Sequence, residues 1–399
     1  MTTQVRHPIW LPAVRPHGAR TFATLYGLES FARASISSVI PIQAYDILQD
    51  KQHVSMLYTA VAILGLSATL FMPMLIERFA RRWIYTAGAV GLMVGSACLL
   101  TNQLPGQVAG MLARVMGASA LSITLNLYIM DHIRKTDFIH AESLRMAWST
   151  VGWTGGPTLG VLLYARFGLL AAHAVPVLFA LILLIVFWRY RLGDNALIRP
   201  GKSRPANPLA NIGRFVSQPR LRVAWIIAFG RSCFWTTFFV YAPLLMVVTG
   251  QGKLAGGLTV SAGNALLFSA LIWGKAGGRF GARKVMSFSF AAMTAMLLAA
   301  GYAGEQHPLV AACCLLACAF FCIALDALAS TAFMRAVHAF ERPQMSAVYR
   351  TYLDLSELLP PLFYSVVLAF FGLGAVFVTL AVSSAVCGWI TWRYLPKRL

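Results

Sequence analysis

The sequence predicts an all-α membrane protein made of two similar bundles of six transmembrane helices. Hydrophobic residues make up 58% of the 399 residues and charged residues only 12%, whereas soluble domains carry about 25% charged residues. The segment 73–82 (PMLIERFARR) and the segment 274–283 (GKAGGRFGAR) lie in equivalent polar gaps between long apolar runs. A repeat at this distance predicts two bundles related by a pseudo-twofold axis.

Twelve apolar runs are long enough to cross a bilayer, because a helix needs roughly 20 residues to span the hydrocarbon core. We expect the helices at 21–45, 54–76, 83–102, 106–130, 146–165, 168–189, 223–249, 254–274, 285–303, 308–334, 347–371 and 374–392. The last two form one apolar stretch, divided here at Gly372-Leu-Gly374 because glycine suits a tight turn. The domains that follow are a tail at 1–20, a bundle at 21–190, a basic flexible linker at 191–222, a bundle at 223–392 and a tail at 393–399.

The positions of lysine and arginine predict the orientation of the chain, since cytoplasmic loops carry the excess. Lys51, Arg166 and Lys253 alone among the 33 basic residues fall in loops on the side opposite the N-terminus. We therefore expect a multi-pass protein of the cell membrane, the inner membrane of a bacterium, with both termini cytoplasmic. The net charge of +20 then reflects topology and anionic lipid headgroups, and nucleic acid is not an expected partner.

Charged residues inside the predicted helices mark functional positions, because each is costly in a bilayer unless it is paired or hydrated. They are Glu29 and Arg33 in the first helix, Arg114 in the fourth, Arg231 in the seventh, Asp326 in the tenth, and Asp354 and Glu357 in the eleventh. Glu29 and Arg33 are four residues apart and can pair along one helix face. Arg231 corresponds to Glu29 in the second half, so we expect both to approach a central cavity.

The four carboxylates outnumber the three arginines, which stay charged in proteins. At least one acid therefore lacks a full partner and can carry a proton. We expect Asp326 or Asp354 in this role, with Glu29 held by Arg33. The alternative is that all seven charges form static structural pairs.

The repeated polar gap resembles the loop between helices 2 and 3 of the major facilitator superfamily, which reads Gly-x-Leu-x-Asp-Arg-x-Gly-Arg-Arg/Lys. The residues that match in the first copy are Leu75, Arg78, Arg81 and Arg82, with Glu77 at the acidic position. The residues that match in the second copy are Gly274, Arg279, Gly281 and Arg283. Pro73 and Ala80 replace the family's glycines, and Gly278 replaces the acid in the second copy.

This resemblance implies a latch in which Glu77 pairs with Arg78 or Arg81 and holds the two halves together when the protein faces outward. The basic residues after the helix also serve the positive-inside rule, which explains them without a latch. Arg114 resembles the family's helix 4 arginine of proton coupling, although Gly117 arrives one place early. Gly152, Gly156, Pro157 and Gly160 resemble the helix 5 signature of the family's antiporters, and they also suit close helix packing.

Aromatic and polar side chains on the expected helices suit a cavity for a small amphipathic molecule. The candidates are Tyr26, Asn126, Trp153, Trp235, Tyr241 and Tyr352. The three intramembrane arginines also suit an anionic substrate. The seven cysteines lie in expected helices without CxxC spacing, so we expect no metal site and no cofactor.

The resemblance and the buried charges together imply a secondary active transporter that works by alternating access as a monomer. We expect proton-coupled efflux of a small organic molecule, by antiport as in the drug/proton-antiporter group. The alternative is proton-coupled uptake of an organic anion. A membrane sensor without transport, or an intramembrane enzyme, is a remote alternative, because the buried charges are kept and the eight histidines show no catalytic cluster.

Overall fold

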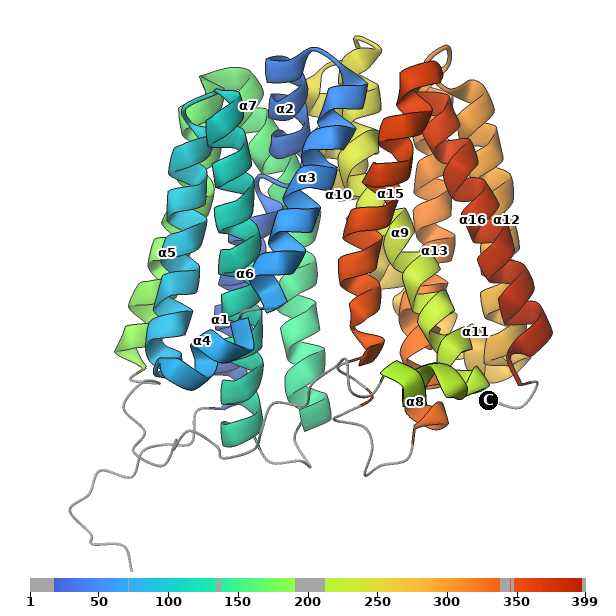
Figure 1. The fold of residues 1–399 in the computed structure, drawn as a ribbon, viewed down its shortest axis with the longest axis horizontal. Coiled ribbons are helices and arrows are strands. Elements are labelled where there is room, and N and C mark those ends of the chain that lie inside the picture. The colour runs from blue at the N-terminus through green and yellow to red at the C-terminus, as the bar shows by residue number, and fades with distance from the viewer. Residues whose placement is uncertain are drawn as a thin grey trace, which may run out of the picture.

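The computed structural model describes residues 18–70, 72–133, 138–190, 212–337, 345 and 348–396 as an assembly of helices in two bundles. Figure 1 shows the N-terminal bundle in blue and green beside the C-terminal bundle in yellow to red. The N-terminal bundle contains α1 (Ala19–Ala34), α2 (Val39–Leu48), α3 (Lys51–Leu70), α4 (Met72–Arg78), α5 (Arg81–Leu99), α6 (Leu104–His132) and α7 (Phe138–Arg189). The C-terminal bundle contains α9 (Pro219–Val248), α10 (Lys253–Ala265), α11 (Ala270–Phe280), α12 (Ala282–Ala303), α13 (Pro308–Ala336), α15 (Thr351–Phe370) and α16 (Leu373–Tyr394).

Each of the twelve expected spans corresponds to one helix, to a broken helix or to one arm of α7. Within the described residues, eight helices are long and apolar enough to cross a membrane by length and composition. One of them, Leu144–Arg189, covers two expected spans, because the helix reverses at Gly168, whose φ of 83° is accessible mainly to glycine. The predicted boundary at Gly372 is present between α15 and α16.

Two expected continuous helices are interrupted within the described residues. The first breaks between α1 and α2, where Ser35 and Ser37 donate their hydroxyl hydrogens to the carbonyls of Ala32 and Ala34 and Pro41 has no N–H to donate. The expected span at 254–274 passes through the 3₁₀ turn Leu266–Ser269 between α10 and α11. Residue 71, between α3 and α4, lies outside the described residues.

The predicted flexible linker is wrong for its C-terminal part. Residues 191–211 lie outside the described residues, but Ile212–Ser217 form the short helix α8 and α9 already begins at Pro219. Proline is well suited to the first turn of a helix, where its missing N–H costs nothing.

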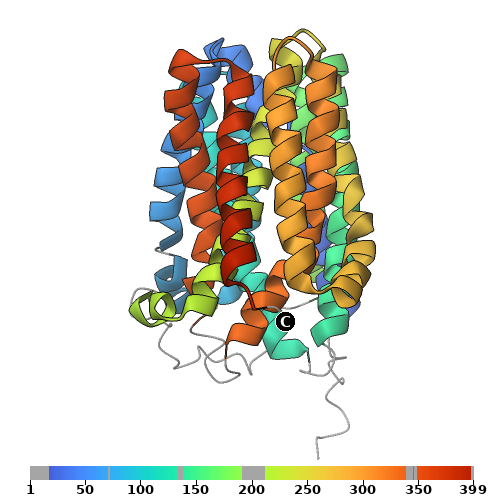
Figure 2. The same cartoon turned by 90° about the vertical axis from the view of Figure 1, so that its right-hand side faces the viewer.

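Three helix pairs make the most extensive contacts between the two bundles among the described residues. α7 packs against α10, α3 against α15, and α2 against the end of α9. The view in Figure 2 looks onto α16 and α12, which cover the C-terminal bundle on the side away from this interface. The first and last described residues lie at the same end of the molecule, which we call the terminal face, and the opposite end is called the far face (Figure 1).

Candidate functional site

Ion pairs join the two bundles at the far face. Lys253 at the start of α10 donates to Asp46 Oδ2 of α2 at 2.5 Å. Tyr164 of α7 donates to the same oxygen at 2.5 Å, and its ring lies 4.1 Å from the Lys253 ammonium. Lys253 of the C-terminal bundle is therefore contacted by a carboxylate and by a tyrosine ring of the N-terminal bundle.

A second pair of opposite polarity lies beside it. Lys51 of α3 donates to Glu305 Oε1 at 2.6 Å, and the backbone N–H of Leu373 at the start of α16 donates to the same oxygen at 2.8 Å. Burial raises the pKa of the Glu305 carboxyl, but the bond from Leu373 and the Lys51 charge outweigh this and hold the pKa below its ordinary value. Glu305 thus links the N-terminal bundle to the positive end of α16.

Below these pairs the interface is closed by hydroxyl contacts. Ser55 of α3 is hydrogen-bonded to Tyr241 of α9, and Thr158 of α7 donates its backbone N–H and its hydroxyl to Ser261 of α10, at 3.0 and 2.7 Å. Tyr241 is fully buried in this contact. Its predicted place in the cavity wall is therefore wrong for this conformation, because the bundles close over it.

The bundles separate toward the terminal face. On α15, Pro361, Tyr364 and Leu368 form a stripe at helical spacing that is buried, and α15 packs against α3 and α9 of the interface. Glu357 continues this stripe one turn toward the terminal face, yet its side chain is exposed. Among the described residues the stripe is uncovered at Glu357, and we call the space beside it, between the two bundles, the cavity.

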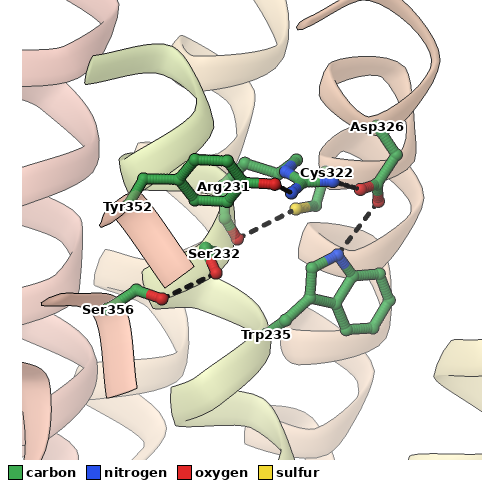
Figure 3. A network of polar contacts seen from close by, with 7 residues as sticks. All are labelled: Arg231, Ser232, Trp235, Cys322, Asp326, Tyr352 and Ser356. Carbon is green, nitrogen blue, oxygen red and sulfur yellow. Dashed lines mark hydrogen bonds and ion pairs between the residues drawn. The ribbon is translucent and has the colours of Figure 1, made fainter. Parts of the chain in front are cut away.

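The C-terminal wall of this cavity carries a polar network around Arg231 (Figure 3). Arg231 of α9 is paired with Asp326 of α13 and donates to the Tyr352 hydroxyl at 3.0 Å. The second oxygen of Asp326 accepts the Trp235 indole N–H at 2.9 Å, and Cys322 Sγ lies 3.7 Å from the Arg231 carbonyl. Four expected site residues from α9, α13 and α15 are thus brought together, and the Asp326 carboxylate is held by both an arginine and a tryptophan.

The N-terminal wall contains the expected Glu29–Arg33 pair. Arg33 Nη1 lies 3.3 Å from Glu29 Oε1, with 37% of the Arg33 side chain exposed and none of Glu29. Glu29 is therefore buried inside the bundle, and the expectation that it reaches the cavity is wrong. Arg33 reaches the cavity instead, and it lies within electrostatic range of Glu357 on the opposite wall.

Arg114 supports the break in the first span. Its Nη2 lies 3.4 Å from the Arg33 carbonyl, near the C-terminal end of α1, where a cation is favoured by the helix dipole. Its Nη1 is buried without a hydrogen-bond partner among the described residues. Arg114 is 8% exposed, so it lies beneath the cavity wall.

Arg145 is a site residue that the sequence analysis missed. It donates to Asn126 at 2.6 Å and to Glu142 at 2.8 Å, and its guanidinium lies 4.5 Å from the centre of the Tyr26 ring. The predicted helix begins at residue 146, which places Arg145 among the cytoplasmic loop cations. Two expected cavity residues, Tyr26 and Asn126, are therefore partners of this arginine.

The glycines of the helix 5 signature face the break between α1 and α2. A Cβ at Gly156 would meet the Ser35 nitrogen at 2.9 Å, and one at Gly160 would lie only 1.5 Å from the Ser35 carbonyl oxygen. Gly152 faces Phe31 in the same groove, with Pro157 between the two later glycines. The ridge thus lets the broken helix lie directly on α7.

Trp153 lies at the interface between the bundles. Its ring centre is 5.2 Å from that of Phe239 of α9. It is half-buried, and Trp235 also stacks on Phe239, with ring centres 5.8 Å apart. Phe239 thus connects Trp153 of the N-terminal bundle with Trp235 of the polar network.

The expected latch lies partly outside the described residues, since the Glu77 side chain is not among them. Arg78 ends α4, and Arg81 and Arg82 begin α5, with Arg82 lying 5.8 Å from the Trp83 ring. In the second copy, Arg279 lies over Phe280 and Arg283 donates to the Trp392 carbonyl of α16. The contacts of Arg279 and Arg283 described here stay within the C-terminal bundle.

Comparison with known proteins identifies what the chain is similar to. A family model described as Major Facilitator Superfamily matches residues 22–268. Curated proteins gave no match.

Many solved structures are similar, and three of them illustrate the range. A POT family transporter in complex with 5-aminolevulinic acid has a TM-score of 0.75 at 13% identity, covering 94% of this chain and 95% of that one. The POT family transporter PepTSo has a TM-score of 0.74 at 11% identity, covering 95% and 97%. The nucleoside transporter NupG has a TM-score of 0.72 at 11% identity, covering 95% and 100%.

Proposed function

Because the chain belongs to the Major Facilitator Superfamily, it is a secondary transporter, and we propose that it exports a small organic molecule in exchange for protons. The terminal face lies in the cytoplasm in this proposal, as the distribution of lysine and arginine predicts. The substrate binds between the two bundles, and the bundles rock about it to open toward one side at a time.

The contrast between the two ends of the interface is the observation that carries the proposal. Two ion pairs of opposite polarity, Asp46–Lys253 and Lys51–Glu305, join the bundles at the far face, whereas the α15 stripe is uncovered at Glu357 toward the terminal face. A carrier that opens to the cytoplasm has this arrangement. Opening to the outside requires these pairs to break and the terminal face to close.

The carboxylates of α15 are the proton sites of the proposal. Asp354 and Glu357 have neither a hydrogen bond nor an ion pair within the described part of the chain, whereas Asp326 is held by Arg231 and Trp235. An unpaired acid inside a bilayer favours the neutral, protonated form. Of the two acids expected to titrate, Asp354 therefore fits the role better than Asp326, and Glu357 joins it.

Proton-coupled uptake of an organic anion is the second candidate. Arg33 reaches the cavity and Arg114 lies behind it, so the N-terminal wall is basic. Solved transporters of the same fold include one bound to 5-aminolevulinic acid and one for nucleosides.

Flux in proteoliposomes separates these candidates. Purified protein is reconstituted with a pH gradient of either sign, and the movement of organic cations, anions and zwitterions is followed. Movement of the compound in the direction opposite to the protons supports antiport, and movement in the same direction as the protons supports symport. Flux that does not respond to the gradient in either direction contradicts proton coupling, and the variants Asp354→Asn and Glu357→Gln should abolish the response where it exists.

A further inference from the structure

The two walls of the cavity leave opposite charges unsatisfied. On the C-terminal wall, Arg231 and Asp326 neutralise each other, which leaves Asp354 and Glu357 without a hydrogen bond or ion pair among the described residues, although Arg350 lies within electrostatic range of Asp354. On the N-terminal wall, Arg33 has one ion-pair contact, at 3.3 Å to Glu29, longer than the 2.7–2.9 Å typical of a strong charged hydrogen bond. The cavity therefore offers a cation on one side and carboxylates on the other.

Both groups face the space between the bundles. Glu357 is exposed on the α15 stripe that is buried against the other bundle one turn further along. Asp354 lies three residues before Glu357 and shares its helix face. Arg33 is 37% exposed at the end of α1, close to the break in the first span.

We infer that the substrate of the transporter is a small zwitterion, whose acidic group is bound by Arg33 and whose basic group is bound by Glu357 and Asp354. This inference rests on the proposed function and names the substrate class of the same site. It assigns one charged group of the substrate to each bundle.

A substrate with a single charge fits this cavity less well. Once Glu357 has released its proton, an anion on Arg33 would lie close to the Glu357 carboxylate, and like charges that share a poorly hydrated site repel strongly. A cation on Glu357 would compete with Arg33, which already lies within electrostatic range of that carboxylate. A zwitterion neutralises both walls at once, and the rings of Trp235 and Trp153 supply apolar surface beside it.

A zwitterionic substrate would also connect binding with the movement of the two bundles. A molecule bound by α1 on one side and α15 on the other draws the bundles together at the level of Glu357, where they are apart in this conformation. The substrate thus favours closure of the terminal face, as alternating access requires.

Matched ligands test the charge requirement on the purified full-length protein in detergent. The probes are L-phenylalanine and 4-(aminomethyl)benzoic acid, each with its methyl ester, which keeps only the cation, and its N-acetyl derivative, which keeps only the anion. Binding is measured by titration calorimetry and by the shift in unfolding temperature. At least one zwitterion should bind about tenfold or more tightly than both of its derivatives, since a hydrogen bond to a charged group contributes about 1.5–3 kcal/mol.

The variant Glu357→Gln assigns the basic group to its subsite. Glu357 has no partner to lose among the described residues, so this variant should fold normally. Its affinity for the zwitterion should fall about tenfold, while its affinity for the N-acetyl derivative should not fall and should rise, because the repulsion by the Glu357 carboxylate is removed. Asp50→Asn, which removes an exposed carboxylate at the far face, is the matched control and should change neither affinity.

The inference is overturned if neither zwitterion binds more tightly than both of its single-charge derivatives. It is also overturned if Glu357→Gln weakens all three forms equally, because the carboxylate then acts on the conformation and not on the amine. Flux of singly charged compounds in proteoliposomes would leave the transporter assignment standing in either case. Absence of flux for every compound would instead remove the proposed function itself.

Discussion

Replacing Gly160 by alanine should damage the protein, whereas the same change at Gly155 should not. A Cβ at Gly160 would lie 1.5 Å from the Ser35 carbonyl oxygen and 2.7 Å from the Ser35 carbonyl carbon, while one at Gly155 meets nothing within 4 Å. Both glycines lie in α7 five positions apart, so they share the same helix and the same membrane environment. They differ in what faces them.

The expected change in stability follows from two opposing contributions. Alanine in place of glycine favours a helix by about 1 kcal/mol at either site. At Gly160 the backbone of the broken helix must also move by about 2 Å to reach ordinary contact, and overpacking of this kind costs about 1–3 kcal/mol, sometimes more. The obstacle is a backbone carbonyl, which cannot rotate away as a flexible side chain can. Gly160→Ala should therefore be destabilised, and Gly155→Ala should be neutral or slightly more stable.

Thermal unfolding of the purified variants in detergent measures this difference directly, with flux in proteoliposomes as the functional readout. Gly160→Ala should unfold at a lower temperature than the wild type and transport more slowly, because the break between α1 and α2 no longer lies on α7. Wild-type stability and flux in Gly160→Ala would refute the view that this glycine is required by the broken helix. Equal losses in both variants would show that glycine is needed for another reason, such as helix flexibility.

Four further predictions concern the charges and the closed far face. Lys51→Glu should favour the state open to the far face, which can be measured by labelling of cysteines placed in the cavity. Combining Lys51→Glu with Glu305→Lys should restore closure, and failure of the double variant to recover would exclude a direct pair. Because the Glu305 pKa is lowered, the contribution of Glu305 to closure is complete above the ordinary glutamate pKa and is lost as the pH falls through the lowered value. Acid should therefore increase the same labelling in the wild type and not in Glu305→Gln. Asp326→Asn should lower stability by about 3–5 kcal/mol, since it leaves Arg231 buried without its carboxylate, and an unchanged unfolding temperature would contradict that pairing. Tyr241→Phe removes one hydroxyl contact across the interface and should weaken closure of the far face by about 1 kcal/mol, seen as a modest rise in labelling.

The family and the fold class were predictable from the sequence because they depend on composition and on a repeated motif. Apolar runs long enough to span a bilayer have few alternatives to helices, since the bilayer core cannot satisfy an exposed backbone. The resemblance to the major facilitator superfamily is confirmed by the family match over residues 22–268. The helix boundaries were less predictable, and the break after Ala34 and the 3₁₀ turn at Leu266–Ser269 both lie inside expected spans.

The charged residues were predictable as a set, but not as pairs. Glu29 and Arg33 are adjacent on one helix, so their spacing indicates the contact that the structure contains. Arg231 and Asp326 are far apart in sequence, and their pairing depends on how α9 packs against α13. Arg145 was missed because hydropathy predicts that the helix begins at residue 146, whereas α7 begins at Phe138.

The far-face ion pairs offer a signal that sequence reasoning could have used. In the orientation expected from the sequence, Lys51 and Lys253 are exceptions to the positive-inside rule, so each needs a reason to be there. The structure supplies one, because each lysine is held by a carboxylate of the opposite bundle. Basic residues on the unfavoured side of a membrane protein therefore merit a search for acidic partners.

By itself, the sequence determined that this chain spans a membrane as two related helical bundles and carries ionisable groups inside them, because hydropathy and charge act locally along the chain. Only the tertiary structure decided which charges neutralise each other and which stay open to the cavity. It also decided that the bundles are joined at one face and apart at the other. These outcomes depend on contacts between segments up to about 250 residues apart, where a displacement of a few ångströms makes or breaks an ion pair.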